Sequence, residues 1–279
     1  MTPIRFHHLK AMALSPAHCR YALDLSERDE QGESTPAMQR GTATHAMLFG
    51  TVRVMTAPED APRKPSSVQR NAKKPSPATI DAIAWWDAFE RESAGAIVMP
   101  AAQYDTCARM ADAVRAEPRA AEMLHGATVE ESILFNRDGL ECRTTPDIRG
   151  LDFECELKTT KSSQPEQFVW QSKRMLYHAQ HAWHLAGMRG NGLLRGPGHA
   201  YTIAVEATAP YVVTVFRIDP HALEIGERCT RLWFERVKSC IESGQWPGYA
   251  QSVVDLDVPE DLDELALSYE GDDTEADAA

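Results

Sequence analysis

The chain has 279 residues with ordinary apolar (43%) and charged (25%) fractions, so it can bury a full core. No apolar run is long enough to cross a bilayer and no signal-peptide pattern opens the sequence, so we expect a cytoplasmic protein without a membrane partner. Six scattered cysteines without a C-x-x-C pair argue against a zinc ribbon, an iron–sulfur cluster and a disulfide framework.

The net charge of −12 is unevenly distributed along the chain. Residues 251–279 hold eleven acidic and no basic side chains, which predicts a disordered acidic tail. Residues 1–250 carry 29 basic and 30 acidic side chains, so this part is close to neutral and has the composition to form a basic groove. We expect 1–250 to form a single domain.

Helix signals dominate the first half of the chain. Ser15-Pro16 predicts a helix that runs to about Leu25, since Ser suits the cap and Pro the first turn. We expect further helices at about 37–49, 79–93 and 101–116, and a short strand around 52–56. Trp85 and Trp86 are interpreted as packing residues rather than a base-stacking wedge.

Residues 57–79 contain five prolines and the basic residues Arg63, Lys64, Arg70, Lys73 and Lys74. This composition predicts a flexible basic loop. Two interpretations carry equal weight: a mobile surface insertion, or an arm whose cations contact DNA phosphates.

The second half of the chain alternates between the two kinds of element. Residues 128–158 read as three strands and about 164–189 as two helices, followed by strands at 200–207 and 211–218 and a helix at 220–243. The predicted fold is α/β (α+β), with a central mixed sheet flanked by helices.

The strand 151–158 carries the strongest functional signal. Its apolar and polar residues alternate as in a half-buried strand, so Glu156 and Lys158 project from one face. Asp147 lies on the preceding strand-like run, 141–149, and a tight turn at Arg149-Gly150 is expected to bring it alongside. Two carboxylates beside an ammonium suit a hard-cation site for metal-assisted hydrolysis of a phosphodiester.

Three further segments carry polar residues in helical or strand spacing. Gly41 and His45 lie one turn apart, and Glu130-Glu131 precedes the Asp147 strand, with the register deciding which glutamate faces the site. A third segment places its side chains on one helical face, namely Tyr177, Gln180 and His184.

The pair Pro146-Asp147 and Glu156-Leu157-Lys158 resembles the PD-(D/E)xK nuclease signature. Taken in order, the segments resemble the RecE (exonuclease VIII-like) branch of that superfamily, found in phages and prophages, over most of the chain. Two positions depart from the branch: His184 stands where Tyr is usual, and Glu156 where Asp is frequent. The resemblance implies a restriction-endonuclease-like core for 1–250.

The activity implied by the resemblance is Mg²⁺-dependent degradation of one strand of linear double-stranded DNA from an end, 5′→3′, with Mn²⁺ expected to substitute. It further implies a ring-shaped homo-oligomer and a single-strand-annealing recombinase of the RecT or Beta type as partner. The protein would then be encoded by a phage or prophage and act in the bacterial host cell.

The expected metal ligands are Asp147, Glu156 and the backbone carbonyl of Leu157, completed by His45 and Glu130. Lys158 is expected to orient or help deprotonate the attacking water and to add positive charge near the phosphate.

Contacts with DNA are expected from a separate set of residues. Gln180, expected to be catalytic together with Asp147, Glu156 and Lys158, would position the strand to be cut. Arg20 and Arg40 would bind a terminal phosphate. Tyr177 and Lys161 are further candidates for DNA contacts.

Other functions fit parts of the pattern. An endonuclease of the same superfamily would use the same catalytic residues, and a non-catalytic DNA-binding or assembly protein could keep the fold. A zinc enzyme built on His178, His181 and His184 is disfavoured, because the three side chains fan over roughly 120° of helix surface.

Overall fold

A computed structural model describes residues 2–28, 35–250 and 252–256. Apart from 252–256, the predicted acidic tail lies outside the described residues. None of the helices in the described ranges is long and apolar enough to span a membrane. The division into one domain and a tail stays a prediction.

Within the described residues, a five-stranded sheet in the order β3-β6-β7-β8-β9 forms the centre of the fold. Only β7 and β8 are parallel, and the remaining neighbours are antiparallel, so the predicted mixed sheet is confirmed. The strands are β3 (Thr128–Val129), β6 (Ile148–Arg149), β7 (Phe153–Thr160), β8 (His199–Glu206) and β9 (Val213–Arg217).

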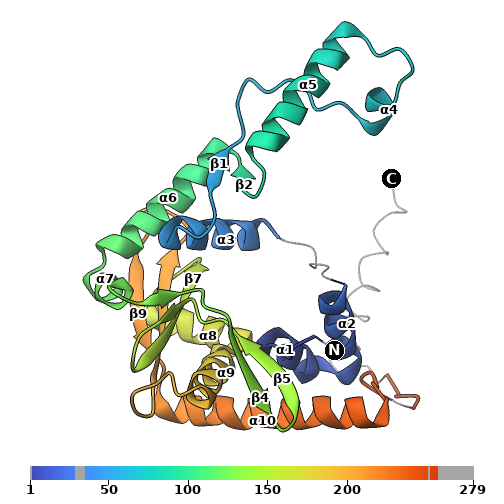
Figure 1. The fold of residues 1–279 in the computed structure, drawn as a ribbon. Coiled ribbons are helices and arrows are strands. Elements are labelled where there is room, and N and C mark those ends of the chain that lie inside the picture. Colours follow the sequence, from blue (N-terminus) through green and yellow to red (C-terminus); the bar gives the residue numbers. More distant parts are fainter. Residues whose placement is uncertain (1, 29–34, 251, 257–279) are drawn as a thin grey trace, which may run out of the picture.

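Helices cover both faces of this sheet (Figure 1). On one face, side chains such as Leu157 and Ile203 pack against α3 (Pro36–Phe49) and α6 (Ala101–Ala116). Helix α6 is followed directly by α7 (Pro118–Leu124). The other face meets the crossover between β7 and β8, formed by α8 (Pro165–Met175) and α9 (Tyr177–Gly190). The last helix, α10 (Pro220–Ser243), packs against α9.

Proline in the first turn, preceded by a polar cap, begins several of these helices. The side chains of Ser15, Thr35, Ser76 and Asp219 each accept a backbone N–H, and each is followed directly by a proline. The predicted starts and ends agree with the structure to within a few residues for α2 (Pro16–Glu27), α3, α5 (Pro77–Glu92), α6 and α10.

A second core joins the N-terminal helices to a separate hairpin. Helix α1 (Phe6–Leu14), which the sequence did not predict, packs with α2 and α10, and the hairpin is β4 (Ile133–Arg137) with β5 (Leu140–Thr144). Ile4 bridges to Cys142, which ties the N-terminus to this hairpin. Trp183 of α9 is fully buried in this core.

The predicted strand over 141–149 is wrong in its middle. Glu141 belongs to β5, and from the predicted run only Ile148 and Arg149 pair with β7. Residues 128–158 therefore contain five strands, divided between two sheets, where the sequence predicted three strands. Pro146 lies in the break, where a proline removes the N–H that a ladder needs. Strand β7 is also buried on both faces along most of its length, not half-buried as predicted.

The segment predicted as a flexible loop is part of an arm, residues 57–96, that projects from the body in Figure 1. The parallel pair β1 (Val54–Thr56) and β2 (Ile97–Met99) forms its base, and α4 (Ser67–Arg70) packs on α5. Two of the cations that the second interpretation assigned to DNA contacts pair with carboxylates of α5: Lys64 Nζ with Glu90 Oε1 and Arg70 Nη1 with Asp87 Oδ1, both at 2.9 Å.

The two tryptophans of the arm pack, as predicted, but within the arm and not in the core of the body. Trp85 and Trp86 form a partly exposed cluster with Phe89 on the arm. Trp86 Nε1 donates to the carbonyl of Pro62 at 2.8 Å. The cluster therefore holds the arm together rather than the body.

We predict that Gly226→Ala destabilises the fold by about 2 kcal/mol or more, because its Cβ would lie 2.3 Å from the carbonyl oxygen of His178 on α9. The Cβ would be bonded directly to the backbone of α10 and the oxygen belongs to the backbone of α9, so the two helices would have to separate. Gly190→Ala is the control, since its Cβ would meet Phe135 at 3.8 Å. Urea denaturation measures both, and equal stability of the two variants would contradict the close approach.

Candidate active site

The site forms where β6 stops pairing with the edge of β7. Beyond Ile148, which pairs with Cys155, the side chain of Asp147 replaces a strand: its Oδ2 accepts the backbone N–H of Leu157 at 2.8 Å. The backbone N–H of Asp147 in turn points to Glu156 Oε1 at 3.3 Å. The carboxyl groups of Asp147 and Glu156 are thus held side by side at one rim of the sheet.

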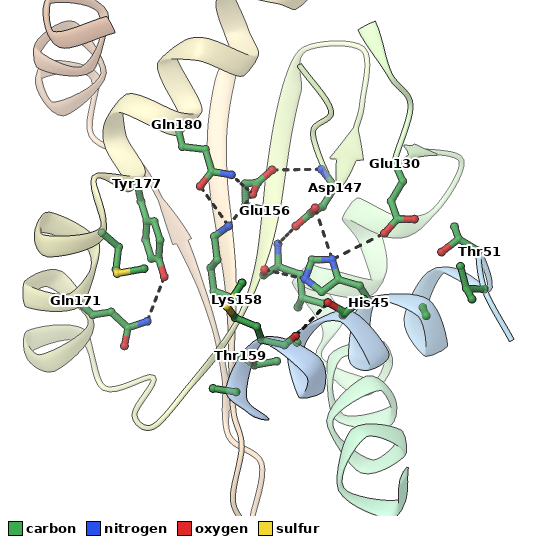
Figure 2. A pocket seen from close by; sticks show the side chains of 18 of the residues that line it. His45, Thr51, Glu130, Asp147, Glu156, Lys158, Thr159, Gln171, Tyr177 and Gln180 are labelled. Atoms are coloured by element: carbon green, nitrogen blue, oxygen red, sulfur yellow. Dashed lines mark hydrogen bonds and ion pairs between the residues drawn. The ribbon is translucent and has the colours of Figure 1, made fainter. Parts of the chain in front are cut away.

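Glu156 and Lys158 form the centre of a hydrogen-bond network with α9. Lys158 Nζ donates to Glu156 Oε2 at 2.7 Å and to Gln180 Oε1 at 3.3 Å, and Gln180 Nε2 donates to Glu156 Oε2 at 2.6 Å. Lys158 Nζ also lies 5.1 Å from the centre of the Tyr177 ring. Figure 2 shows Lys158 enclosed between these groups.

The charges of this network determine its protonation. Burial alone would raise the pKa of Glu156, but the charges of Lys158 and His184 outweigh it and hold the pKa well below its usual range. For Lys158, burial would lower the pKa, and the neighbouring Glu156 and Asp147 raise it instead. Burial, followed by the charge of Glu156, raises the pKa of Asp147. Lys158 is therefore an ammonium beside an ionised Glu156.

His45 of α3 approaches the same rim from the opposite layer. Its Nε2 lies 3.1 Å from the Leu157 carbonyl oxygen, and its Nδ1 lies 3.6 Å from Asp147 Oδ1 and 4.0 Å from Glu130 Oε1 (Figure 2). Glu130 has a left-handed backbone, φ 48°, which is uncommon for a non-glycine residue and sits here at the site.

The choice between the two adjacent glutamates follows from this turn. Glu130 lines the cavity, whereas Glu131 accepts from Arg149 Nε at 2.7 Å. Glu130 is therefore the glutamate that faces the predicted metal ligands.

These side chains line one cavity of about 750 Å³. Among its lining residues are most of the predicted site residues: His45, Glu130, Asp147, Glu156, Leu157, Lys158, Tyr177 and Gln180. Gly41 also lines it and packs near Thr159, and Gln171 donates to the Tyr177 hydroxyl at 3.3 Å.

Three predicted DNA-binding residues do not line this cavity. Arg20 instead pairs with Asp24 one turn along α2, and its Nη2 lies 3.7 Å from Glu27. Arg40 lies on α3 outside the lining. Lys161 lines a neighbouring cavity on α8. The sequence could not place these arginines, because helix position alone does not give the partner of a side chain.

A second carboxylate–histidine group lies behind the cavity. Ligand atoms of Glu154, Glu156 and His184 all lie within 4.8 Å of one another, and all three residues are buried. His184 Nε2 is 3.1 Å from Glu156 Oε1, out of line for a hydrogen bond, while its Nδ1 contacts the Thr144 hydroxyl. His184 stands at the position where the RecE-like branch usually has Tyr, and its side chain contacts Glu156 from behind the cavity.

Glu154 has a structural partner of its own. Its Oε1 lies 2.6 Å from His181 Nδ1, and His181 Nε2 lies 2.8 Å from the Thr202 hydroxyl. Burial raises the pKa of Glu154 well above its usual value and lowers the pKa of His181 to about 4, so both groups are uncharged at neutral pH. An uncharged Glu154, absent from the cavity lining, is a poor cation ligand.

Sequence reasoning missed a second cavity, of about 260 Å³, which shares Gln180 with the first. Arg5 and Arg143 line it together with Thr145 and His184, and no acidic residue does. The Nε atoms of both arginines are buried without a hydrogen-bond partner among the described residues. Arg5 precedes the unpredicted helix α1, and Arg143 lies on the wrongly extended strand. The sequence signals that could have flagged them are the positive charge of both and the position of Arg143 four residues before Asp147.

Comparisons with known proteins agree with this geometry. The model of a family described as a PDDEXK-like domain of unknown function matches residues 6–255. No curated protein matches the chain in sequence.

Among solved structures, a candidate exonuclease from Eubacterium rectale is similar, with 10% identity, a TM-score of 0.57, and 94% of this chain and 92% of that chain covered. At this identity the likeness concerns the fold alone. An alkaline exonuclease from Laribacter hongkongensis has 16% identity and covers 71% of this chain and 94% of that one, but its TM-score of 0.30 is too low to support an argument.

The two buried glutamates give a matched pair for mutation. We predict that Glu154→Gln leaves divalent-cation affinity within about three-fold and stability within about 1 kcal/mol, since an amide still donates to His181. Glu156→Gln should lower the affinity at least ten-fold, because it removes a charged carboxylate from the cavity rim. Calorimetric titration with Mg²⁺ and Mn²⁺ measures both. Equal losses would show that Glu154 carries a charge to the cation.

Proposed function

Since the chain belongs to the family of PDDEXK-like domains, we propose that it is a metal-dependent deoxyribonuclease that degrades linear double-stranded DNA from an end. The observation that carries the proposal is the gathering of Asp147, Glu156 and Lys158 at one rim of the sheet. These are the positions of the Pro-Asp and Glu-x-Lys motifs, and they line an open cavity.

The donor set at the rim fits a hard divalent cation. Asp147 and Glu130 offer carboxylate oxygens, Leu157 offers a carbonyl oxygen, and the imidazole of His45 lies within about 4 Å of all three. Oxygen-rich sets of this kind suit Mg²⁺ or Mn²⁺. A cation bound there supplies Lewis acidity to the phosphodiester.

Lys158 and Gln180 act on the substrate side of Glu156. With its pKa raised, Lys158 keeps its proton, so it orients the attacking water and offsets negative charge on the phosphate. This narrows the sequence-based expectation, which left a role in deprotonation open. Gln180 holds both Lys158 and Glu156 and thereby fixes the angle at which the ammonium is presented.

The smaller cavity supports action at ends. A terminal phosphate is a dianion, and two guanidinium groups with unused buried Nε donors beside threonine hydroxyls are suited to bind it. The cavity shares Gln180 with the catalytic one, so a strand end held there would lie close to the metal ligands. Arg5 and Arg143 therefore replace Arg20 and Arg40 in this role.

The order of the motifs supports placing the protein in the RecE-like branch. The proposal then includes 5′→3′ polarity, assembly into a ring, and hand-over of the remaining strand to a single-strand-annealing recombinase in a bacterial host cell. Among the basic residues of 57–79, those without a carboxylate partner in the described residues, Arg63, Lys73 and Lys74, are available for phosphates of the duplex.

DNA topology tests the proposal directly. With Mg²⁺ or Mn²⁺ we expect loss of linear duplex DNA and survival of covalently closed circles, since closed circles have no end. Lys158→Ala should lower the rate at least a hundred-fold, because the ammonium at the phosphate is removed, while DNA binding persists. Gel analysis of both substrates measures this. Cleavage of closed circles would establish the endonuclease alternative instead.

End recognition generates a separate prediction. Arg143→Ala should lower the preference for 5′-phosphorylated over 5′-hydroxyl ends by about ten-fold or more, the worth of a charge-assisted hydrogen bond. Arg20→Ala is the matched control, because Arg20 already pairs with Asp24. The ratio of kcat/KM for the two ends is the readout. An unchanged ratio in Arg143→Ala, or a reduced one in Arg20→Ala, would contradict the assignment.

A further inference from the structure

A second groove adjoins the catalytic cavity along α8. It has a volume of about 590 Å³ and shares Gln171 and Arg174 with the catalytic cavity. Lys161, Trp170 and Lys173 line its far part, and no acidic residue lines it. An anionic ligand that extends from the catalytic cavity past Arg174 would therefore enter this α8 groove without meeting a carboxylate that repels it.

The cations of the α8 groove have no acidic partners. Lys161, Lys173 and Arg174 are exposed, and none forms an ion pair with a carboxylate among the described residues. Elsewhere in the described chain, cations such as Lys64 and Arg149 do pair with carboxylates. Three unpaired cations on one short stretch favour an anionic ligand with several charges, as a chain of phosphates has.

Trp170 adds a flat apolar surface to these charges. It is 69% exposed, and it is the only one of the six tryptophans, all within the described residues, that is exposed rather than buried or half-buried. Lys173 Nζ lies 5.4 Å from its ring centre. An exposed indole beside unpaired cations matches a nucleobase stacked next to its phosphate.

The rest of α8 is fixed, so the groove is a preformed surface. Phe168 is buried and stacks on Phe216 with ring centres 4.7 Å apart. Gln171 accepts from the Thr160 hydroxyl at 2.9 Å and donates to Tyr177, which holds it at the boundary between the two cavities. The inner side of α8 is therefore used for packing, and its outer side presents Trp170 and Lys173.

We propose that the α8 groove binds single-stranded DNA continuous with the strand in the catalytic cavity, one base stacking on Trp170 and the phosphates contacting Lys161, Lys173 and Arg174. Single strands are favoured over duplex because only an unpaired base exposes its face to the indole. The inference rests on the proposed nuclease function and names the path of one strand.

Binding without a divalent cation tests this, because hydrolysis is then excluded. The full chain in EDTA is titrated into a fluorescently labelled twelve-nucleotide oligothymidine and, separately, into a labelled blunt duplex. Fluorescence anisotropy measures binding to each. Trp170→Ala should weaken oligothymidine binding about ten-fold or more, and Trp170→Phe should retain most of the affinity. Duplex binding should change less than two-fold in both variants.

The charge contribution is measured through the salt dependence. Lys173→Ala should reduce the slope of log affinity against log salt for the oligothymidine by about 0.7, as expected for one lost phosphate contact. Arg236→Ala and Leu232→Ala, exposed positions on α10, are the matched controls for charge and apolar surface. Neither control should change the affinity.

The outcomes separate this inference from the proposed function. If oligothymidine binding is unchanged in Trp170→Ala, or if duplex and single-strand binding fall equally, the α8 groove is not a single-strand path. If Trp170 proves necessary for binding but the wild-type chain hydrolyses no DNA in Mg²⁺ or Mn²⁺, the groove assignment stands and the nuclease proposal fails.

Discussion

The edge of β7 at Leu157 is the constraint on which the site depends. A strand edge inside a fold leaves backbone groups that must find partners. Here Pro146 ends the pairing with β6, the carboxylate of Asp147 takes the N–H of Leu157, and His45 meets its carbonyl. The same gap that satisfies the backbone therefore collects a carboxylate, an imidazole and a carbonyl at one point.

One face of β7 packs in the apolar core, and the other carries the polar residues of the site. Cys155 and Leu157 face the α3–α6 layer, while Glu154, Glu156 and Lys158 face α9. Along that polar face the surroundings separate two similar glutamates. Glu154 is paired with a neutral His181 and loses its charge, whereas Glu156 lies beside Lys158 and keeps it. At Glu156 the counter-charge that keeps the carboxylate ionised is thus built into the network, whereas Glu154 has none among the described residues.

Three cavities surround this rim and differ in chemistry. The central one holds the carboxylates, the one beside α1 holds two arginines, and the α8 groove holds exposed cations with an indole. Carboxylates in the central cavity are therefore flanked by cation-lined cavities on two sides. That arrangement suits a polyanion that must be held on both sides of the proposed cation site, which is how the proposed function and the proposed strand path fit together.

The sequence by itself determined local structure and which side chains share a face. Polar cap residues followed by proline predicted where helices begin, and strand alternation predicted that Glu156 and Lys158 share a face. Both signals depend on backbone geometry over a few residues. Only the tertiary structure decided which distant groups meet. His45 reaches Leu157 across 112 residues, and Glu130 rather than Glu131 faces it. Packing between layers also decides three other features: the ion pair of Arg20, the cavity lined by Arg5 and Arg143, and the exposure of Trp170. The spacing of residues within one helix or strand does not specify such packing.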